Sequence, residues 1–356
     1  MHHVRKCRLY RWLAFGIAAL LLCSGCGQAD QTATPNGSAA RPIRVGVLRL
    51  AGSAPLFIGM EKGFFADEGL TVEPVWFDAA QPVAVATAAG EVDVGASGLT
   101  AGLYNLAAGG KIPVLVADKG RETAAHASSI LVVTKAQYDR GVRTVADLAG
   151  KRIGNTQAGS SYQYMLGTML EQAGLPTQAV SYVNLGKVGA IVAALQSGQI
   201  DGAILNEPHA SRLIADGTVC AIAPVGTLAP CQIAAIFYSP ALATDTVRAT
   251  AFMRGYIRAC RYYHDVVFSA DASTRDRDPR YRELTDIIAR YTATPPEEIG
   301  AMLPYIDRDG TLDEASVIAQ LNWYHTHGYV RDVIDPAALL RTDIRTRAAD
   351  ELGGAS

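Results

Sequence analysis

VATAAGEVDVGASGLT, from Val85 to Thr100, and VAALQSGQIDGAILNE, from Val192 to Glu207, follow one pattern. Each stretch begins as an apolar helical segment, reaches a glycine, and continues three residues later with an aspartate and a short apolar strand. Gly90 and Gly198 stand where a helix would end, because glycine readily adopts the left-handed conformation of a C-cap. The two stretches lie 108 residues apart and predict two similar α/β units. Coincidence is the alternative, since this connection is common in α/β proteins.

Strand and helix signals alternate on both sides of this repeat. The apolar residues 43–48 predict a strand, and residues 55–68 predict a helix closed by Gly69. The second unit starts at the apolar residues 129–133, and the chain becomes mostly helical between residues 245 and 327. Such alternation is typical of α/β folds in which doubly wound sheets carry helices on both faces.

The N-terminus has the pattern of a bacterial lipoprotein export signal, with four cationic residues, a twelve-residue apolar run and a small pair before Cys26. Twelve residues span about 18 Å as a helix, short of the roughly 30 Å hydrocarbon core of a membrane. We therefore predict a signal peptide in residues 1–25, lipidation of Cys26, and a flexible tether in residues 26–42. Cys23 stands where such signals usually carry leucine, so cleavage at a different site is the alternative.

Removal of residues 1–25 lowers the formal net charge from −2 to −6, because it removes four cations and no acids. An acidic chain lacks the basic surface that nucleic-acid binding needs, so we expect no nucleic-acid partner.

Three cysteines remain in the predicted mature body: Cys220, Cys231 and Cys260. Export would place them in an oxidising compartment, so a disulfide between Cys220 and Cys231 is one interpretation. Buried thiols are the other.

Three loops with small and hydroxyl side chains follow predicted strands, at residues 52–54, 97–100 and 159–161. In open α/β sheets, ligands bind beyond the carboxyl ends of strands, where helix N-termini present free amides. We therefore predict ligand contacts at Ser53, Ala54, Ser97, Gly98, Thr100, Ser160 and Ser161. Helix capping by the hydroxyl groups is the alternative for each loop.

Five further side chains are candidates for the same site. Asn206 and Glu207 occupy the position in the second unit that corresponds to Gly98 and Leu99, although Glu207 could equally favour a helix N-terminus. Phe77 and Tyr162 would be apolar walls, with a place in the core as the alternative for Phe77. Arg121 could pair with a carboxylate or sulfonate, or belong to a solvated charge run.

The motifs of common enzyme classes are missing. The sequence contains no GxxxxGK[ST] loop, GxGxxG fingerprint or HExxH helix. His325 and His327 are two residues apart and would not share a helix face, and the acidic run at residues 307–310 gives an incomplete calcium loop. We therefore expect no catalytic residues, no metal and no cofactor.

Several runs in order resemble one family, the solute-binding proteins of ABC importers in the nitrate, sulfonate and taurine group (NMT1/THI5-like, SsuA/TauA-like). These runs are residues 55–65 with 68–70, residues 150–154 with 159–161, residues 198–203 leading to 207–208, and residues 309–313 through 320–324. The resemblance implies a two-lobed, type II periplasmic-binding-protein fold whose lobes close by hinge motion. We expect lobe I in residues 43–127 and 234–345, lobe II in residues 128–233, and a polar tail in residues 346–356.

The resemblance also implies a function. We expect a monomeric, lipid-anchored protein of the periplasm or cell surface that captures a small solute and delivers it to an ABC permease and its ATPase. The amide-rich loops favour a sulfonate, a carboxylate or a nitrate-like anion, although the same hydroxyl groups could hold a neutral heterocycle. A sensing or tethering lipoprotein is the second interpretation. A pyrimidine-synthesis enzyme is the third, but its clustered cysteines have no match here.

Overall fold

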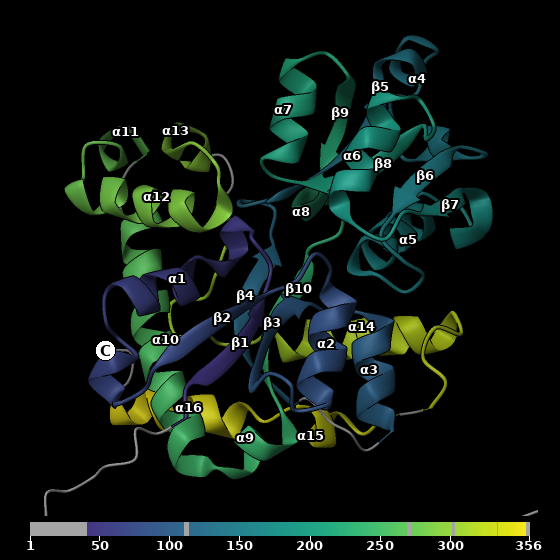
Figure 1. The fold of residues 1–356 in the computed structure, drawn as a ribbon. Coiled ribbons are helices and arrows are strands. Elements are labelled where there is room, and N and C mark those ends of the chain that lie inside the picture. The colour runs from purple at the N-terminus through teal and green to yellow at the C-terminus, as the bar shows by residue number, and fades with distance from the viewer. Residues whose placement is uncertain (1–40, 110–113, 269–271, 301–302, 333, 354–356) are drawn as a thin grey trace, which may run out of the picture. The chain divides into compact units, whose positions relative to one another are not determined.

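The computed structural model describes residues 41–109, 114–268, 272–300, 303–332 and 334–353. The predicted signal peptide, the lipidation site Cys26 and nearly all of the predicted tether lie outside these ranges. Within them, no helix is both long and apolar enough to cross a membrane. The described residues form two five-stranded sheets with helices packed against them (Figure 1).

The first sheet has the strand order β2-β1-β3-β10-β4. Its strands are β1 (Ile43–Val47), β2 (Val72–Trp76), β3 (Val94–Gly98), β4 (Val114–Glu122) and β10 (Cys231–Tyr238). β1 runs parallel to β2 and β3, whereas β10 is antiparallel to both β3 and β4. A strand from the second half of the chain therefore lies between two strands from the first half.

The second sheet has the strand order β7-β6-β8-β5-β9. Its strands are β5 (Ser129–Thr134), β6 (Arg152–Asn155), β7 (Ser181–Asn184), β8 (Gly202–Asn206) and β9 (Val219–Pro224). β6 runs parallel to β7 and β8, and β5 is antiparallel to β8 and β9. In both sheets, therefore, four strands run in one direction, and the fourth strand in the order, β10 or β5, runs opposite to them.

The helices fall into two groups along the chain. Those before β5 or after β10 are α1 (Ala54–Glu61), α2 (Ala80–Ala88), α3 (Ala101–Ala108), α9 (Pro240–Thr244), α10 (Thr246–Val267), α11 (Ala272–Arg275), α12 (Pro279–Thr292), α13 (Pro296–Ile299), α14 (Glu314–Thr326), α15 (Pro336–Leu339) and α16 (Thr342–Glu351). Those between β5 and β10 are α4 (Lys135–Asp139), α5 (Ser161–Gln172), α6 (Val188–Gln196), α7 (His209–Ala215) and α8 (Val225–Leu228). Short 3₁₀ turns are η1 (Ala51–Ser53), η2 (Ala66–Glu68), η3 (Ala146–Leu148) and η4 (Thr177–Ala179).

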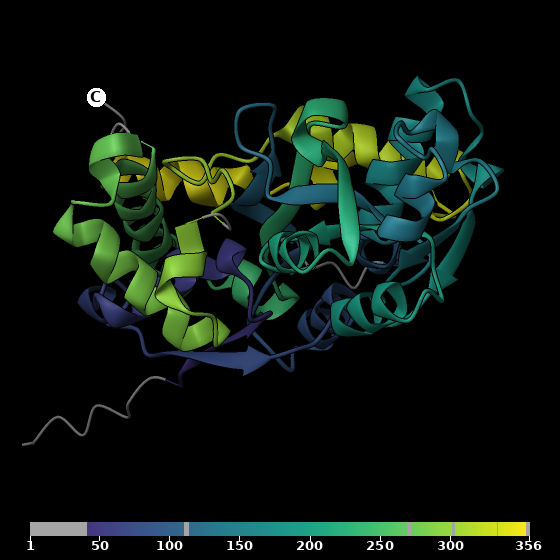
Figure 2. The same ribbon diagram turned by 90° about the horizontal axis from the view of Figure 1, so that it is seen from above.

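Helices cover both faces of the first sheet (Figure 2). Ile236 and Tyr238 of β10 belong to a core shared with α1 and α10, whereas Ala235 and Phe237 belong to a core shared with α3 and α14. This division follows from the strand itself, because successive side chains point to opposite faces of a sheet. All four side chains are buried, which is why β10 reads as a nearly continuous apolar run.

The two similar units predicted from the sequence share the same local contacts. The helices α2 and α6 are each followed by a left-handed glycine, Gly90 at φ 74° and Gly198 at φ 70°. Three residues later, Asp93 Oδ2 accepts a hydrogen bond from the backbone N–H of Arg44 at 2.9 Å. The same bond joins Asp201 Oδ2 to the N–H of Arg152 at 2.8 Å. Each aspartate therefore fastens its own strand to the neighbouring parallel strand.

The packing beside these aspartates is repeated as well. Gly46 of β1 lies beneath Val83 and Val92, and Gly154 of β6 lies beneath Ile191 and Ile200. Each residue of the second set is 108 positions beyond its counterpart. The lack of a side chain at either glycine lets the helix approach the sheet closely. The repeat therefore extends from the turn to the helix-to-sheet packing.

Two crossovers, β4 to β5 and β9 to β10, join the sheets and touch at Gly226 of α8. A Cβ atom on Gly226 would lie 2.1 Å from the carbonyl oxygen of Thr123, so only glycine fits there. In the first crossover, the buried carboxylate of Glu122 accepts hydrogen bonds from Ser128 N at 3.0 Å and Ser128 Oγ at 2.9 Å. Burial raises the pKa of Glu122 above its usual value.

Three sequence predictions differ from the structure. The helix predicted for residues 55–68 ends at Glu61, because Gly63 takes a left-handed φ of 73°. β10 begins at Cys231, inside the range predicted for lobe II. The tail predicted for residues 346–356 overlaps α16, in which Ile344, Ala348 and Ala349 are buried.

The thiols of Cys220, Cys231 and Cys260 are free, so the predicted alternative of a disulfide between Cys220 and Cys231 is not formed. Cys220 lies on β9 of the second sheet and Cys231 opens β10 of the first. Cys231 and Cys260 are buried, and burial raises the pKa of both thiols. Two of the three therefore behave as small core residues.

Candidate functional site

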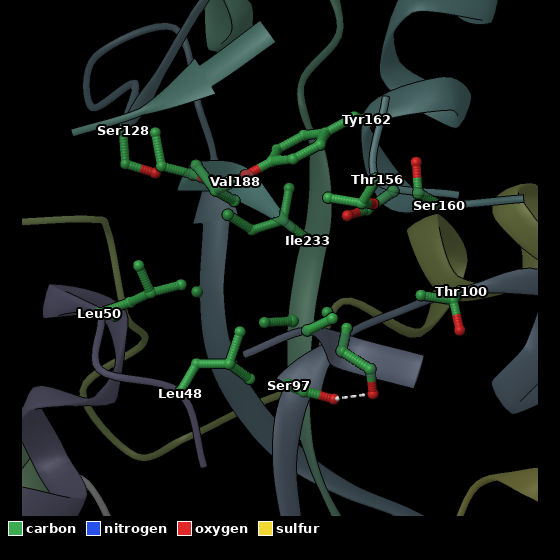
Figure 3. Close-up of a pocket in the computed structure, with 18 of the residues that line it drawn as sticks. Leu48, Leu50, Ser97, Thr100, Ser128, Thr156, Ser160, Tyr162, Val188 and Ile233 are labelled. Carbon is green, nitrogen blue, oxygen red and sulfur yellow. Dashed lines mark hydrogen bonds between the residues drawn. The ribbon is translucent and has the colours of Figure 1, made fainter. Parts of the chain in front are cut away.

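A cavity of about 120 Å³ lies between residues of the two sheets. The elements of the first sheet contribute Leu48, Leu50, Gly52, Asp78, Ser97, Gly98, Thr100, Lys119, Ile233 and Pro304, and those of the second contribute Ser128, Thr156, Ser160, Ser161, Tyr162, Val188, Asn206 and Glu207. Figure 3 shows Leu48 and Leu50 on one side of this space, with Tyr162 and Val188 on the other. Strand ends and the loops after them form most of the wall, as expected for α/β sheets.

Eight of the predicted contact residues line this cavity: Ser97, Gly98, Thr100, Ser160, Ser161, Tyr162, Asn206 and Glu207. The structure thus brings together residues from all three predicted loops, Gly52 among them, and the end of β8. The four others, Ser53, Ala54, Phe77 and Arg121, are not among the residues that line this cavity.

Ser53 and Ala54 are fully buried beside the cavity rather than in its wall. Ser53 Oγ donates a hydrogen bond to the carbonyl oxygen of Leu48 at 3.1 Å, which closes the turn after β1. Ala54 belongs to the apolar core with α10. The loop was predicted correctly, but its cavity-facing residues are Leu50, Ala51 and Gly52.

Phe77 and Arg121 have structural partners instead. Phe77 packs against β1, where its ring lies 3.2 Å from the position that a Cβ on Gly46 would take. Arg121 pairs with Asp118 at 3.6 Å and donates a hydrogen bond to the carbonyl oxygen of Thr311. Its guanidinium therefore fastens β4 to the chain before α14.

Thr100 and Ser160 are helix caps, which confirms for these two loops the alternative given with the sequence. Thr100 Oγ1 accepts from Leu103 N at 3.1 Å. Ser160 Oγ accepts from Gln163 N at 3.2 Å and donates to Asn155 Oδ1. Both hydroxyl groups line the cavity, but their hydrogen bonds hold α3 and α5 in place.

Ser161 and Gly98 mark where the two walls approach each other. A Cβ atom on Gly98 would lie 3.3 Å from Ser161 Oγ, so the absence of a side chain there keeps the gap open. Two hydrogen bonds cross nearby. Ala101 N donates to the carbonyl oxygen of Gly159 at 2.8 Å, and the hydroxyl of Tyr324 donates to the carbonyl oxygen of Ser160 at 2.9 Å.

The polar side chains at the end of β8 are also held by neighbours. Asn206 accepts a hydrogen bond from the hydroxyl of Tyr162 and donates one to Ser129 Oγ at 2.8 Å. The carboxylate of Glu207 accepts from Ser211 N at 3.0 Å and from Ser211 Oγ at 2.8 Å, within the first turn of α7. Glu207 therefore acts on the helix N-terminus, as the sequence alternative stated.

Lys119 lines the cavity and was missed by the sequence reasoning. It lies in β4, where Asp118 pairs with Ala235 and Gly120 pairs with Ala234, so Lys119 is an extra residue opposite no partner. Ile233 is the extra residue on β10, between the pairs of Gln232 and Ala234. Such β-bulges re-aim side chains, and here both extra residues face the cavity.

The ammonium group of Lys119 is in an apolar setting. Its side chain is buried, with 4% of the residue exposed. Burial lowers the pKa of Lys119 to about 8, although the nearby charge of Asp118 opposes this. A glycine within a charged stretch of an otherwise apolar strand, as in DKGRE, is the sequence signal that could have indicated a bulge.

No group of three or more metal-ligating side chains occurs among the described residues. The acidic and basic residues of the cavity wall are Asp78, Lys119 and Glu207, and Asp78 is exposed. The cavity thus provides apolar surface, hydrogen-bonding groups and one buried cation, which suits binding of a small molecule.

Two lobes, each built on a five-stranded sheet and separated by a lined cavity, define the type II fold of periplasmic binding proteins. The nitrate-binding protein NrtA of Synechocystis PCC 6803 shares this fold with a TM-score of 0.70 at 16% identity, covering 88% of this chain and 89% of NrtA. The alkanesulfonate-binding protein SsuA of Xanthomonas axonopodis pv. citri, bound to MOPS, gives a TM-score of 0.64 at 21% identity, covering 86% of this chain and 99% of SsuA.

Within this class, the chain belongs to the NMT1-like family, whose model matches residues 36–275, more than half of its length. The taurine-binding periplasmic protein of Escherichia coli (strain K12) is 32% identical over 184 residues. These residues are 51% of this chain and 53% of the relative, so the chain spans about half of that protein's length. The family expected from the sequence runs is confirmed.

Proposed function

We propose that this protein is the extracytoplasmic solute-binding component of an ABC importer. The observation that carries this proposal is the cavity, whose wall comes from both lobes. A solute inside it would contact both lobes at once and so favour their closed arrangement over an open one. Reversible capture of this kind needs no reacting groups, and membership of the NMT1-like family supports it.

The helix N-terminus that faces the cavity favours an anionic solute. α5 has twelve residues, and Ser161 and Tyr162 are its first two, so their N–H groups have no acceptor within the helix. Such amides and the positive end of the helix dipole attract sulfonate, carboxylate or nitrate-like groups. The taurine, alkanesulfonate and nitrate in the names of its relatives each carry an anionic group.

The size and lining of the cavity favour an organic anion over a purely inorganic one. One water molecule needs about 10–15 Å³ of such volume. The cavity of about 120 Å³ would therefore hold a molecule of roughly ten non-hydrogen atoms. Leu48, Leu50, Val188 and Ile233 would cover its apolar part.

Delivery and location complete the proposal. We infer that residues 1–25 direct export, that Cys26 carries the lipid, and that residues 26–42 tether a monomeric body in the periplasm or at the cell surface. The closed protein would then present its solute to a permease that works with an ATPase. The N-terminal pattern of four cations, a short apolar run and a cysteine supports the anchoring.

The test is a thermal-shift screen of the mature protein with alkanesulfonates, carboxylates, nitrate and pyrimidines, followed by calorimetry of the hits. A solute at a hundred times its dissociation constant would stabilise the protein by about 2.7 kcal/mol. A sulfonate or carboxylate hit with one-to-one stoichiometry would support the proposal. A folded protein that responds to none of these solutes would contradict it.

A further inference from the structure

Lys119 is a buried cation that forms no ion pair with any residue in the described part of the chain. Its Nζ has no hydrogen bond and no ion pair with any residue in the part of the chain that the structure describes. A buried ammonium without a partner is costly, so such groups normally have a counter-ion. The bulge that turns Lys119 into the cavity therefore places an unbalanced charge where a solute would sit.

The neighbouring carboxylates are engaged elsewhere. Asp118 Oδ1 accepts from Gly120 N at 2.7 Å and from Gln232 Nε2 at 2.5 Å, and its Oδ2 accepts from Asp307 N at 2.7 Å. Glu207, on the other lobe, is held by Ser211. Asp78 is exposed at the cavity wall. None of the three forms an ion pair with Lys119 among the described residues.

The space beside the ammonium group is open. Gly52 is its neighbour, and a Cβ atom there would lie 3.8 Å from Lys119 Nζ and 3.6 Å from the ring of Pro304. Glycine thus leaves a gap of ordinary contact distance next to the charge. Leu50 and Ile233 line the same cavity, so an anion at this place would have apolar surface beside it.

We propose that Lys119 selects the solute by its charge: a single anionic head group pairs with the ammonium, and the solute's apolar part lies against Leu50 and Ile233. The bound anion supplies the counter-ion that the protein lacks. This inference rests on the proposed function and goes beyond it, because it assigns the choice of anions over neutral solutes to one side chain on β4. The helix N-terminus of α5 then adds a weaker preference for anions and orients the bound head group.

The pairing makes capture depend on pH. The lowered pKa of Lys119, about 8, means that the ammonium form predominates below pH 8 and is lost above it. An anion therefore binds more tightly at pH 7 than at pH 9.5. A neutral solute has no such dependence on this residue.

The first experiment compares the wild-type protein with Lys119→Met, which keeps the length of the side chain and removes its charge. The probes are 1-butanesulfonate, butanoate and the neutral butanamide, measured by calorimetry at pH 7 and pH 9.5. We expect Lys119→Met to lose at least tenfold in affinity for the anions, to keep its affinity for butanamide, and to show no decline between the two pH values. Lys119→Arg, which stays charged at pH 9.5, should keep the preference for anions and lose the decline.

The control is Lys187→Met, an exposed lysine directly before the cavity residue Val188. It removes a nearby charge without touching the wall, so anion affinity should stay within twofold. An equal loss in both variants would show a general field effect and overturn the role of Lys119.

Melting of the solute-free proteins gives a second, independent result. Because Lys119 has no counter-ion, Lys119→Met should melt at the same temperature as the wild type or above it. A lower melting temperature would show that Lys119 has a structural partner, and would overturn the inference. Anion binding by the wild type with no change in Lys119→Met would also overturn it while leaving the proposed function intact. A wild type that binds no probe would instead contradict the proposed function itself.

Discussion

The two lobes contain the same α/β unit, but the residues at the end of its strand differ. In both, an aspartate after a left-handed glycine holds the adjacent strand, and a glycine in that strand admits two aliphatic side chains. Beyond the strand the copies differ, because β3 ends in Gly98 whereas the corresponding residue of β8 is Asn206. The shared part builds the sheet, and the divergent part lines the cavity. Within one motif, therefore, the residues that build the sheet and the residues that line the cavity occupy separate positions.

The largest effect, on solute affinity, should come from a substitution that gives the end of β3 the same residue as the end of β8. Gly98→Asn would give both walls an asparagine, but a Cβ atom at Gly98 already lies 3.3 Å from Ser161 Oγ and 3.5 Å from the carbonyl oxygen of Ile233. The carboxamide would occupy the gap between the walls, so we expect a loss of solute affinity of about 100-fold or more, equal to about 2.7 kcal/mol. Calorimetry with the solute found in the screen measures it.

The matched control is Gly189→Asn on α6, where a Cβ atom would meet nothing within 4 Å. It should leave affinity unchanged. Retention of binding within tenfold in Gly98→Asn would contradict the view that this gap holds the solute.

The next effect concerns the shared aspartates. Asp201→Ala removes bonds to Arg152 and Gln137, and hydrogen bonds to charged groups contribute about 1.5–3 kcal/mol, so a loss of about 2.5 kcal/mol of unfolding free energy is expected. Asp93→Ala removes bonds to Arg44 and Arg41 and should cost about 2 kcal/mol. Urea unfolding measures both. If neither Asp201→Ala nor Asp93→Ala lowers the unfolding free energy, the repeated contact does not contribute to stability.

Asp201 also makes the stability of the protein depend on pH in acid. Its bonds with Arg152 lower the pKa of Asp201. An acid whose pKa falls on folding stabilises the protein above its unfolded pKa, near 3.9, and loses that contribution as the pH falls further. Asp201→Ala should therefore weaken the dependence of stability on pH below about 4.

A smaller difference separates the two shared glycines. A Cβ atom on Gly154 would lie 2.4 Å from Cδ1 of Ile200, whereas one on Gly46 would lie 3.2 Å from Cγ2 of Val92, the corresponding residue. Gly154→Ala should cost about 2 kcal/mol of stability and Gly46→Ala about 1 kcal/mol, since overpacking typically costs 1–3 kcal/mol. Adding Ile200→Val to Gly154→Ala removes the clashing methyl group and should recover most of the loss. If the double variant is no better than Gly154→Ala, the contact with Ile200 is not the cause.

The smallest effect concerns Lys119 of β4, a strand that belongs to neither copy of the repeated unit. A lysine whose pKa falls on folding opposes folding while both states are protonated, and this penalty declines as the pH rises from about 8 toward 10.5. Between pH 8 and pH 9 the wild type should gain about 1 kcal/mol relative to Lys119→Met. The comparison between variants is needed because the thiols of Cys231 and Cys260, whose pKa burial raises, make the stability of both proteins depend on pH in the same way. Parallel pH profiles for the two proteins would mean that Lys119 titrates normally.

The sequence predicted the parts of this molecule that depend on periodicity and local turns. The glycines that end α2 and α6, the parallel strands and the loops around Ser97 and Ser160 all follow from residue patterns within a short window. Glu207 and Ser160 line the cavity, but their side chains also accept hydrogen bonds at helix starts. A hydroxyl or carboxylate at such a position suits helix capping as well as ligand binding, so the sequence alone does not separate the two roles.

The sequence does not reveal that Lys119 faces the cavity, and it predicts Arg121 as the cation that pairs with a solute instead. The alternation of side chains along β4 changes at each bulge, and the bulges arise only when β10 pairs with β4 from more than 100 residues away. Ser53 was misplaced for a related reason, since the turn after β1 directs its hydroxyl to Leu48. Local patterns locate a loop, whereas long-range pairing decides which of its residues face the cavity.

The position of β10 has a consequence for how the chain acquires its structure. The second sheet is continuous in sequence, from β5 to β9, so its contacts can form as soon as that segment is available. The first sheet lacks its fourth strand until residues 231–238 arrive, and β4 has no partner before then. Pairings between distant segments form slowly, and unpaired strand edges invite aggregation. The first lobe is therefore the last to be completed, and until then its exposed β3 and β4 edges are the segments that most need protection.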